Sequence, residues 1–305
     1  MRHIQFSPGD TIIDIRRDSV FKAAFTADTP PSQGALRALI SAFIGRNVQV
    51  LTVIANEPPA QDLRDRQIRY DIRVKFDRGE LANVEMTLHP GGFEPLRFEY
   101  YTARLHAAQE IRGQRYGNLV PAWQINFVSA RRLFPDASFF HHFEYYDPER
   151  GTGLGGRTHI LVVELEKVDD LLSKPVEELS AVEGWAVFFR FAADPEWRSV
   201  INKLMSKEEG IAMAGEMLLT VTKEEIEQAR RETALKIELD WESYMAEAWE
   251  KGEAKGEAAG WQKRDEKARR EKLESARRLK AMGVPLNKIA AGLDLPPEEI
   301  EALEI

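Results

Sequence analysis

The sequence predicts an α/β protein in which helices flank a mixed central sheet and a helical C-terminal extension follows. Three observations favour this class. Short β-branched segments alternate with helical patterns through about residue 168. A pair of alternating segments joined by a tight turn occupies 70–88. From residue 224 onward Glu, Lys, Arg and Ala dominate, which is typical of a solvated helix.

The composition limits the classes of protein and site. The chain has 305 residues, 43% of them hydrophobic, so a sizeable core can be buried. It has no cysteine, which excludes disulfides, thiolate metal sites and cysteine nucleophiles. The formal net charge is -8, so binding to nucleic acid would need a local positive surface. Since neither a signal peptide nor a membrane span is visible, we expect a cytoplasmic protein without membrane association.

The first elements are two helices and a strand. The segment from Asp18 places its apolar residues on one helical face. The Pro-Pro pair at 30–31 predicts a break, after which Ser32 caps a second helix over 34–43. The β-branched stretch 48–54 favours a strand.

A hairpin comes next, with strands over 70–76 and 81–88 and a turn at Asp77-Arg78-Gly79. Alternation and helical periodicity then continue along the chain. The patterns predict a helix over 95–111, strands over 121–129, 139–146 and 159–165, and a helical segment over 175–222.

The C-terminal part is charged and then becomes apolar again. Residues 263–280 are rich in Lys and Arg with acidic residues interleaved, which fits a solvated helix face or an arm that contacts phosphates. Gly283 ends a helix, 286–291 form a second one, and Pro296-Pro297 begin a third. The second helix offers only Lys288 as a basic side chain, so docking or oligomerisation is as good an interpretation as DNA reading.

The hairpin carries the main candidate site. Asp71 and Glu85 lie on its two strands, which bring them toward a common face. Two neighbouring carboxylates repel each other unless a proton or cation lies between them, so a hard divalent metal is a candidate ligand. Thr87 shares the face of Glu85, and Met86 points into the core. The alternative is a surface hairpin whose acidic residues are solvated.

Asp71, Gly79 and the run Glu85-Met86-Thr87 resemble the core of the PD-(D/E)XK nuclease superfamily. Within it, the chain is similar to the transposase-like branch, the recombination-promoting nuclease family. The resemblance covers roughly 18–305 and is strongest over 18–168. It also rests on Asp18-Ser19-Val20-Phe21-Lys22, on Tyr101, Arg104, Gln109, Gly113, Tyr116, Leu119 and Pro121, on Glu164-Leu165-Glu166-Lys167, and on the Lys-Gly-Glu-rich arm.

The resemblance implies a restriction-endonuclease-like core that cleaves DNA endonucleolytically with Mg²⁺, or with Mn²⁺, in transposase-like recombination. It implies Asp71 and Glu85 as catalytic metal ligands, with the backbone carbonyl of Met86 completing the coordination. The third catalytic position is usually Lys in the superfamily and Gln in this branch. Here that position is Thr87.

Thr87 departs from the family pattern in a way that bears on activity. Thr is shorter than Lys or Gln and carries no charge, so at best it hydrogen-bonds a water molecule. Losing a preorganised donor commonly costs roughly 100- to 1000-fold in rate. The hypothesis is that the protein is slow or inactive, or that a basic residue from elsewhere substitutes. Lys75 and His89, each four residues beyond a carboxylate, are the candidates.

Lys75, Tyr101 and Arg104 are the predicted nucleic-acid contacts. Tyr101 and Arg104 lie one helical turn apart and can face a phosphate backbone together. Packing, or an ion pair to a nearby Glu, is the alternative for both.

Three other features have structural interpretations. Asp18 is more easily explained as an N-cap than as a ligand. The adjacent pair 141–142 lies on a strand, so the two imidazoles face opposite ways and do not share a metal. A buried Glu164 would need a partner, for which Lys167 and Arg157 are available.

The predicted domains are a nuclease-like domain over 1–170, a helical extension over 171–222, a charged helical arm over 223–282 and a small helical motif over 283–305. Two functional alternatives remain open. One is a degenerate family member that binds nucleic acid or protein without cleaving. The other is an interaction protein whose charged arm forms a homo-oligomer.

Overall fold

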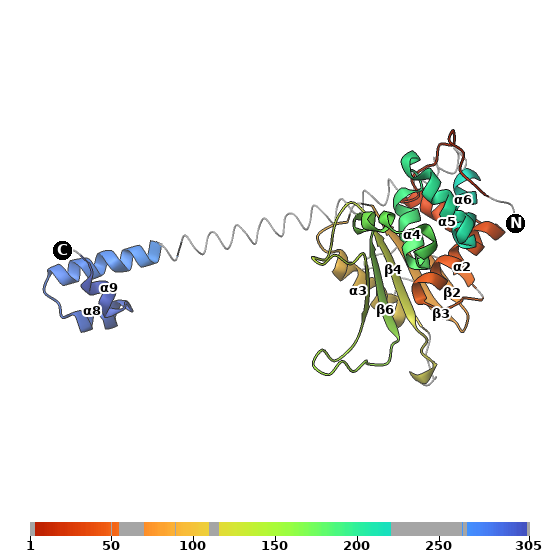
Figure 1. Cartoon of the computed structure of the whole chain (residues 1–305). Helices are drawn as coiled ribbons and strands as arrows, with labels where there is room; N and C mark the ends of the chain where they lie inside the picture. Colours follow the sequence, from red (N-terminus) through yellow and green to blue (C-terminus); the bar gives the residue numbers. More distant parts are fainter. Residues whose placement is uncertain are drawn as a thin grey trace. The chain divides into compact units, whose positions relative to one another are not determined.

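The computed structural model describes residues 4–49, 51–54, 70–88, 90–109, 116–220, 264 and 267–303. The chain divides into two compact units, Met1–Lys236 and Ile237–Ile305 (Figure 1). Across these described residues, every helix is too short or too polar to span a lipid bilayer.

The first unit contains a mixed sheet and the helices that cover it. Its α-helices are α1 (Asp18–Thr26), α2 (Pro30–Ile44), α3 (Glu94–Ala107), α4 (Ala181–Phe191), α5 (Arg198–Lys207) and α6 (Glu209–Thr220). Its strands are β1 (Leu51–Ile54), β2 (Ile72–Phe76), β3 (Glu80–Thr87), β4 (Ala122–Val128), β5 (Phe140–Glu144) and β6 (Thr158–Glu164). Short 3-10 segments are η1 (Tyr116–Asn118), η2 (Leu165–Lys167), η3 (Asp169–Ser173), η4 (Val176–Glu178) and η5 (Pro195–Trp197).

The six strands pair in the order β1-β2-β3-β4-β6-β5. The three central strands β3, β4 and β6 run parallel, and antiparallel strands complete the sheet on both sides. Helix α3 connects β3 to β4, as a parallel neighbour requires a crossover. The predicted fold class, an α/β restriction-endonuclease-like core with C-terminal helices, is confirmed.

The predicted hairpin forms as β2 and β3, with Ile72 opposite Val84. Its turn needs left-handed backbone, since φ is 40° at Asp77 and 91° at Gly79. Glycine accepts this conformation without a steric penalty. The Gly79 N–H donates to the Phe76 carbonyl at 2.9 Å and closes the turn.

The sheet has two different faces. One face of β3, with Ala82, Val84 and Met86, belongs to the main hydrophobic core together with residues of α1, α2, α4 and α6. The other face lies under α3, where Phe98 packs against Val128. The strands are therefore buried on both sides, as parallel strands in α/β proteins usually are.

The helices that follow residue 170 share this main core. Phe25 of α1 lies 6.0 Å, between ring centroids, from both Trp185 and Phe189 of α4. The predicted helical extension over 171–222 therefore packs into the same core as the sheet, as far as residue 220. The boundary at 170 remains a prediction from the sequence alone.

Two predicted helix starts are wrong. The second helix begins at Pro30, and Thr29 caps it by accepting the Ser32 N–H at 3.4 Å. The Pro-Pro pair forms the first turn, where the missing N–H groups need no partner. Asp18 is not an N-cap, because it is the first helical residue and Arg17 precedes it as the cap.

In the second unit, the described residues form a small bundle of a helix over 267–281, α8 (Leu286–Leu293) and α9 (Pro297–Glu301). Gly283, with φ of 79°, ends the first of these helices as predicted. Part of the basic run serves this unit itself, because the Lys280 ammonium donates to the Glu301 carbonyl at 2.8 Å. Its apolar core contains Ala276, Ile289, Leu295 and Ile300.

Candidate functional site

Asp71 and Glu85 lie together at the edge where β2 begins and β3 ends. The Asp71 N–H donates to Oε1 of Glu85 at 3.0 Å, and the Met86 N–H donates to Oδ2 of Asp71 at 3.1 Å. Asp71 is 0% exposed and Glu85 is 2% exposed. The two acidic side chains are thus held together by backbone donors inside the protein.

The strand geometry also orients Met86 and Thr87. In an antiparallel pair, the N–H and C=O of one residue point toward the same neighbouring strand. Since the Met86 N–H binds Asp71, the Met86 carbonyl opens on the same side. Thr87 is half-buried on the face of Glu85, and its own carbonyl accepts the Ser129 N–H at 2.9 Å.

A lysine from α1 approaches this carboxylate pair. The Lys22 ammonium lies 3.4 Å from Oδ1 of Asp71 and 3.2 Å from Oδ2 of Asp18. Its side chain is 18% exposed, so the contact is partly shielded from water. The sequence indicated the helical motif at 18–22 but not this placement, which depends on how α1 packs against β2 and β3.

An arginine from α3 lies over the second carboxylate. Nη2 of Arg97 is 3.5 Å from Oε2 of Glu85, and Nη1 is 3.5 Å from Oε2 of Glu94. The guanidinium also lies 5.0 Å from the centre of the Tyr101 ring. Lys22 and Arg97 therefore compensate the charges of Asp71 and Glu85 respectively.

A buried row of amide side chains hydrogen-bonds to Glu85. Nδ2 of Asn83 donates to Oε1 of Glu85 at 2.9 Å and to Oε1 of Gln124 at 3.0 Å. Nε2 of Gln124 donates to Oδ1 of Asn126 at 2.8 Å, and Nδ2 of Asn126 donates to the Leu161 carbonyl at 3.1 Å. This chain of hydrogen bonds fixes the Glu85 carboxylate across β3, β4 and β6.

The sequence did contain a signal for the amide row. Gln124 and Asn126 are the polar members of an alternating strand, and they pair in register with Asn83 and Glu85. Alternation by itself predicts a solvated face. Only the packing of α3 over this face reveals that these residues are buried.

Tyr101 is used for packing. Its ring makes an edge contact with Tyr70 at 5.5 Å between centroids, and its carbonyl accepts the Tyr70 hydroxyl at 3.4 Å. Burial raises the pKa of Tyr70 to about 12, against the opposing charges of Arg73 and Arg104. Tyr101 and Arg104 thus lie on α3 near Tyr70, and a phosphate contact by either stays a prediction.

The two predicted replacements for the missing catalytic lysine are placed differently. Lys75 is exposed, and its Cε would lie 3.3 Å from a Cβ on Gly79, so its side chain reaches toward the hairpin turn. Four residues of strand separate it from Asp71, roughly 13 Å. His89 lies outside the described residues. The structure therefore gives Lys75 no contact with the carboxylates and offers Lys22 in its place.

Other basic side chains gather where β4 ends. Nη1 of Arg16 donates to Oγ of Ser129 at 3.1 Å, and the same guanidinium pairs with Asp14 at 2.8 Å. Nη1 of Arg131 donates to the Gly91 carbonyl at 3.0 Å. In open α/β sheets, the carboxyl ends of the parallel strands border the ligand crevice. Arg16 and Arg131, which we call the rim arginines, are far apart in the chain, so sequence patterns do not indicate that both lie at this edge.

Glu164, at the end of β6, has a structural role. It is fully buried and forms an ion pair with Lys167 as predicted. It also accepts a hydrogen bond from Nε2 of His141 at 3.2 Å. His141 and His142 face opposite sides of the sheet, also as predicted, because His142 lies beside Glu144 on the other face.

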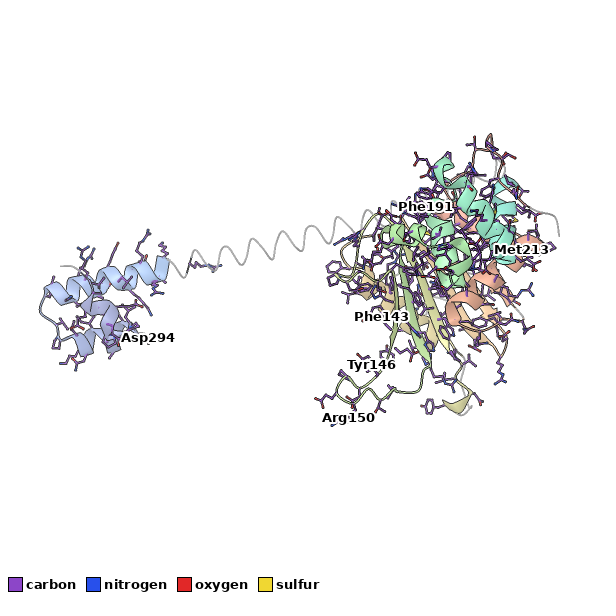
Figure 2. All side chains as sticks on the ribbon, in the orientation of Figure 1. Phe143, Tyr146, Arg150, Phe191, Met213 and Asp294 are labelled. Atoms are coloured by element: carbon purple, nitrogen blue, oxygen red, sulfur yellow. The ribbon has the colours of Figure 1, made fainter. Side chains whose placement is uncertain are left out.

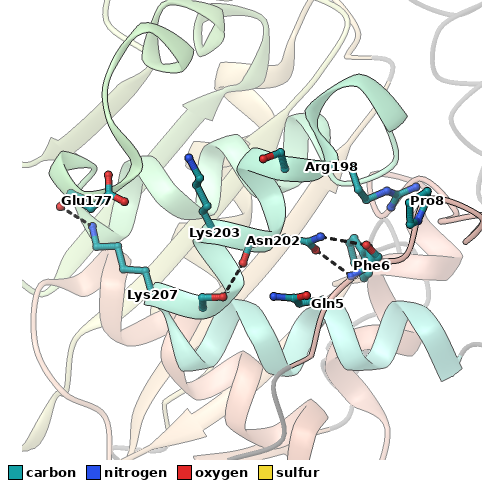
Figure 3. Close-up of a pocket in the computed structure, with 10 residues that line it drawn as sticks. Gln5, Phe6, Pro8, Glu177, Arg198, Asn202, Lys203 and Lys207 are labelled. Carbon is teal, nitrogen blue, oxygen red and sulfur yellow. Dashed lines mark hydrogen bonds between the residues drawn. The ribbon is translucent and has the colours of Figure 1, made fainter.

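A separate hollow of about 700 Å³ lies between the N-terminal segment and α5 (Figure 3). Asn202 binds both backbone groups of Phe6 there, at 2.8 Å to its N–H and 3.0 Å to its carbonyl. These bonds fasten the N-terminal segment to α5. The hollow is lined by none of the carboxylates described above, so it adds nothing to their chemistry.

Comparison with known proteins places the chain in a family. No curated protein and no solved structure matches it significantly. A family model described as PD-(D/E)XK nuclease family transposase matches residues 15–248, which include α1, the hairpin, α3 and the core helices. The chain therefore belongs to the PD-(D/E)XK nuclease family transposases.

Proposed function

We propose that this chain is a DNA endonuclease that uses Mg²⁺, or alternatively Mn²⁺, held by Asp71, Glu85 and the carbonyl of Met86. One observation carries the proposal. Buried Asp71 and Glu85 meet at the carboxyl end of the parallel strands, with the Lys22 ammonium 3.4 Å from the Asp71 carboxylate. Membership of the nuclease family supports DNA as the substrate.

The donor set suits a hard cation. Two carboxylates and a backbone carbonyl supply oxygen ligands only, which Mg²⁺ prefers over nitrogen and sulfur. When bound, a divalent ion would polarise the scissile phosphate and lower the pKa of the attacking water. Asn83 and the Asp71 N–H both hydrogen-bond to Oε1 of Glu85, so this carboxylate is already oriented.

Lys22 is our candidate for the positive group that Thr87 does not provide. Its ammonium can donate to a phosphate oxygen or to the attacking water, because it has three donors and contacts two carboxylates. Thr87, on the same face as Glu85, can hydrogen-bond a water molecule. Arg97 keeps Glu85 in position from the α3 side.

The proposed DNA contacts are the basic side chains at the rim, Arg16 and Arg131 first among them. With a net charge of -8, the protein depends on such a local patch to attract a duplex. Contacts to phosphates position a nucleic acid without reading its sequence. We therefore propose a weak sequence preference.

The test is nicking of supercoiled plasmid in Mg²⁺ or Mn²⁺ by the wild-type protein, Asp71→Asn and Glu85→Gln. Both substitutions keep an acceptor in place while removing a charge. We expect each to reduce nicking by about 100-fold or more, whereas Asp147→Asn, in an exposed ion pair with Arg150, leaves it unchanged. Thermal unfolding checks that all variants fold. Nicking that survives both substitutions would exclude this site.

A second candidate function is binding of nucleic acid without cleavage. The observation that favours it is the charge balance, because Lys22 and Arg97 already compensate both carboxylates, and Thr87 lacks the usual donor. Salt-dependent DNA binding by a wild-type protein that does not nick would favour this function. Arg16→Gln should then weaken binding, with Arg150→Gln as the exposed control.

A further inference from the structure

Three potential ligand side chains converge at the other end of the sheet, on the ladder between β5 and β6. Glu144 of β5 is the direct partner of His159 on β6. His142 lies two residues before Glu144, so its side chain is on the same face. Among the described residues, these three form the only group of three or more His, Cys, Asp or Glu side chains whose ligand atoms lie close enough together to share a metal ion.

The three ligand atoms form a small triangle. Nε2 of His142 is 3.1 Å from Oε1 of Glu144 and 3.1 Å from Nδ1 of His159, which is 2.9 Å from the same Glu144 oxygen. Ligands of a tetrahedral zinc ion, each about 2.0–2.2 Å from the metal, lie roughly 3.3–3.5 Å apart. Small side-chain rotations would therefore open this triangle around an ion.

The hydrogen-bond donors in the triangle are too few for its acceptors. Nε2 of His159 lies 3.0 Å from the Gly156 carbonyl, which can only accept, so this nitrogen carries the proton. In a neutral imidazole, Nδ1 of His159 is then an acceptor that faces a carboxylate oxygen. Only the Nε2–H of His142 then remains to donate within the triangle, although Nδ1 of His159 and Oε1 of Glu144 are both acceptors. Either an additional proton or a metal cation would complete the group.

His159 is held in the orientation that a ligand needs. Its ring stacks on Trp123 at 3.7 Å between centroids with 10° between planes. Trp123 in turn donates from Nε1 to Oε2 of Glu80 at 3.4 Å. A ligating histidine commonly donates its other ring N–H to a carbonyl or carboxylate, as His159 does to Gly156.

Solvent can reach the group from one side. The side chains of His142 and Glu144 are 39% and 40% exposed, whereas His159 is 7% exposed. A hollow of about 670 Å³ is lined by Trp123, Gly156 and His159.

We propose that His142, Glu144 and His159 bind one zinc ion, with water as the fourth ligand. Two imidazoles and a carboxylate suit Zn²⁺ and not Mg²⁺, which binds oxygen ligands. The site is independent of the nuclease proposal, since it lies on the opposite face of the sheet from Glu85 and at the amino end of β6.

The expected effect of the ion is to join β5, an edge strand, to β6. The chain between them forms the loop that carries Tyr146 and Arg150 and extends beyond the sheet (Figure 2). A metal ion bound at the base of this loop would hold β5 and β6 in their register. A ligand that binds only the folded state also raises the unfolding temperature, because it stabilises that state by a free energy that grows with the logarithm of ligand concentration over Kd.

The experiment uses tag-free, full-length protein stripped of metal and titrated with ZnCl₂ by calorimetry. We expect one zinc per chain and a higher unfolding temperature. Losing a supporting residue already weakens metal sites by about 10- to 100-fold, so His142→Gln and Glu144→Gln should each weaken zinc binding by about 100-fold. His106→Gln on α3 is the matched control. Co²⁺ should give the intense visible absorption of a tetrahedral site in the wild type and in His106→Gln, but not in His142→Gln or Glu144→Gln.

The outcomes separate this site from the nuclease site. Zinc binding that persists in the Asp71→Asn, Glu85→Gln double variant supports the proposal. Zinc binding lost in that double variant and kept in His142→Gln would overturn it. Absence of stoichiometric binding by the wild-type protein would also overturn it, whatever its effect on DNA.

Discussion

The ammonium of Lys22 on α1 lies 3.4 Å from Oδ1 of Asp71, which is fully buried at the start of β2. A buried carboxylate without a partner would be costly, and here a cation from a distant helix compensates it. If the protein cleaves DNA as we propose, the same cation can also contact a phosphate at the carboxyl end of the sheet. We therefore expect Lys22 to serve both stability and catalysis.

Lys22→Met should reduce plasmid nicking by about 100-fold, because a positive donor preorganised for the developing charge is lost. It should also make Mg²⁺ bind more tightly, because the competing cation has gone. The matched control is Lys203→Met, an exposed lysine on α5, which should leave nicking unchanged. Loss of nicking in Lys203→Met but not in Lys22→Met would contradict the assignment.

Thr87→Lys or Thr87→Gln should increase nicking by about tenfold or more if the third catalytic position limits the rate. Thr87 is half-buried beside Glu85, so a longer donor there can reach the carboxylate pair. Single-turnover nicking rates at saturating Mg²⁺ measure the change, with Thr52→Gln on exposed β1 as the control. Equal rates for wild type and both variants would remove Thr87 as the limiting feature.

Gln124→Leu should lower the free energy of unfolding by about 1–3 kcal/mol, because the buried amides of Asn83 and Asn126 lose a partner. Urea unfolding measures the effect. Gln33→Leu, on the exposed side of α2, should change stability by less than about 0.5 kcal/mol. If Gln124→Leu left the free energy of unfolding unchanged, the amide row would not contribute to stability.

The raised pKa of Tyr70 predicts that the free energy of unfolding falls at alkaline pH. Burial raises its pKa from 10.0 to about 12, so the folded state keeps a proton that the unfolded state releases. The stabilisation is complete below about pH 10 and is lost as the pH rises toward 12. Tyr70→Phe should flatten this fall, which urea unfolding at pH 9 and pH 11 can measure. Identical pH dependence in both proteins would argue against the raised pKa.

The charged arm is proposed to form a homo-oligomer. A chain ending at Thr220 keeps the helices of the main core that the structure describes, including α6. We expect it to remain folded and to have a smaller oligomeric state than the full chain. Light scattering coupled to size-exclusion chromatography measures both masses. An unchanged oligomeric state would exclude the arm as the assembly element.

Much of the fold is visible in local patterns. The alternation on both sides of Gly79 predicts β2 and β3. The φ of 91° at Gly79 explains why a glycine occupies this turn position. A proline pair commonly indicates a break, so the sequence predicts α2 from residue 34, whereas the helix begins at Pro30. The same two residues are acceptable in a first turn, where the N–H groups of a helix have no intrahelical partner.

The candidate site was only partly predictable. Asp71 and Glu85 were found because they lie on one hairpin, whose register follows from its turn. The sequence does not indicate that Lys22, Arg97 and the β4 amides Gln124 and Asn126 belong to the site, because they lie on other elements of the fold than the hairpin. Likewise, His142 and His159 are separated by a long loop that hides their proximity.

By itself, the sequence determined the strands, most helices, the family resemblance and the hairpin that carries two carboxylates. The tertiary structure decided which charges surround them, since α1 and α3 bring Lys22 and Arg97 to opposite ends of the pair. It also decided that Gln124 and Asn126 are buried. The physical reason is that periodicity and turn chemistry act between near neighbours, whereas burial and charge compensation depend on packing between distant segments.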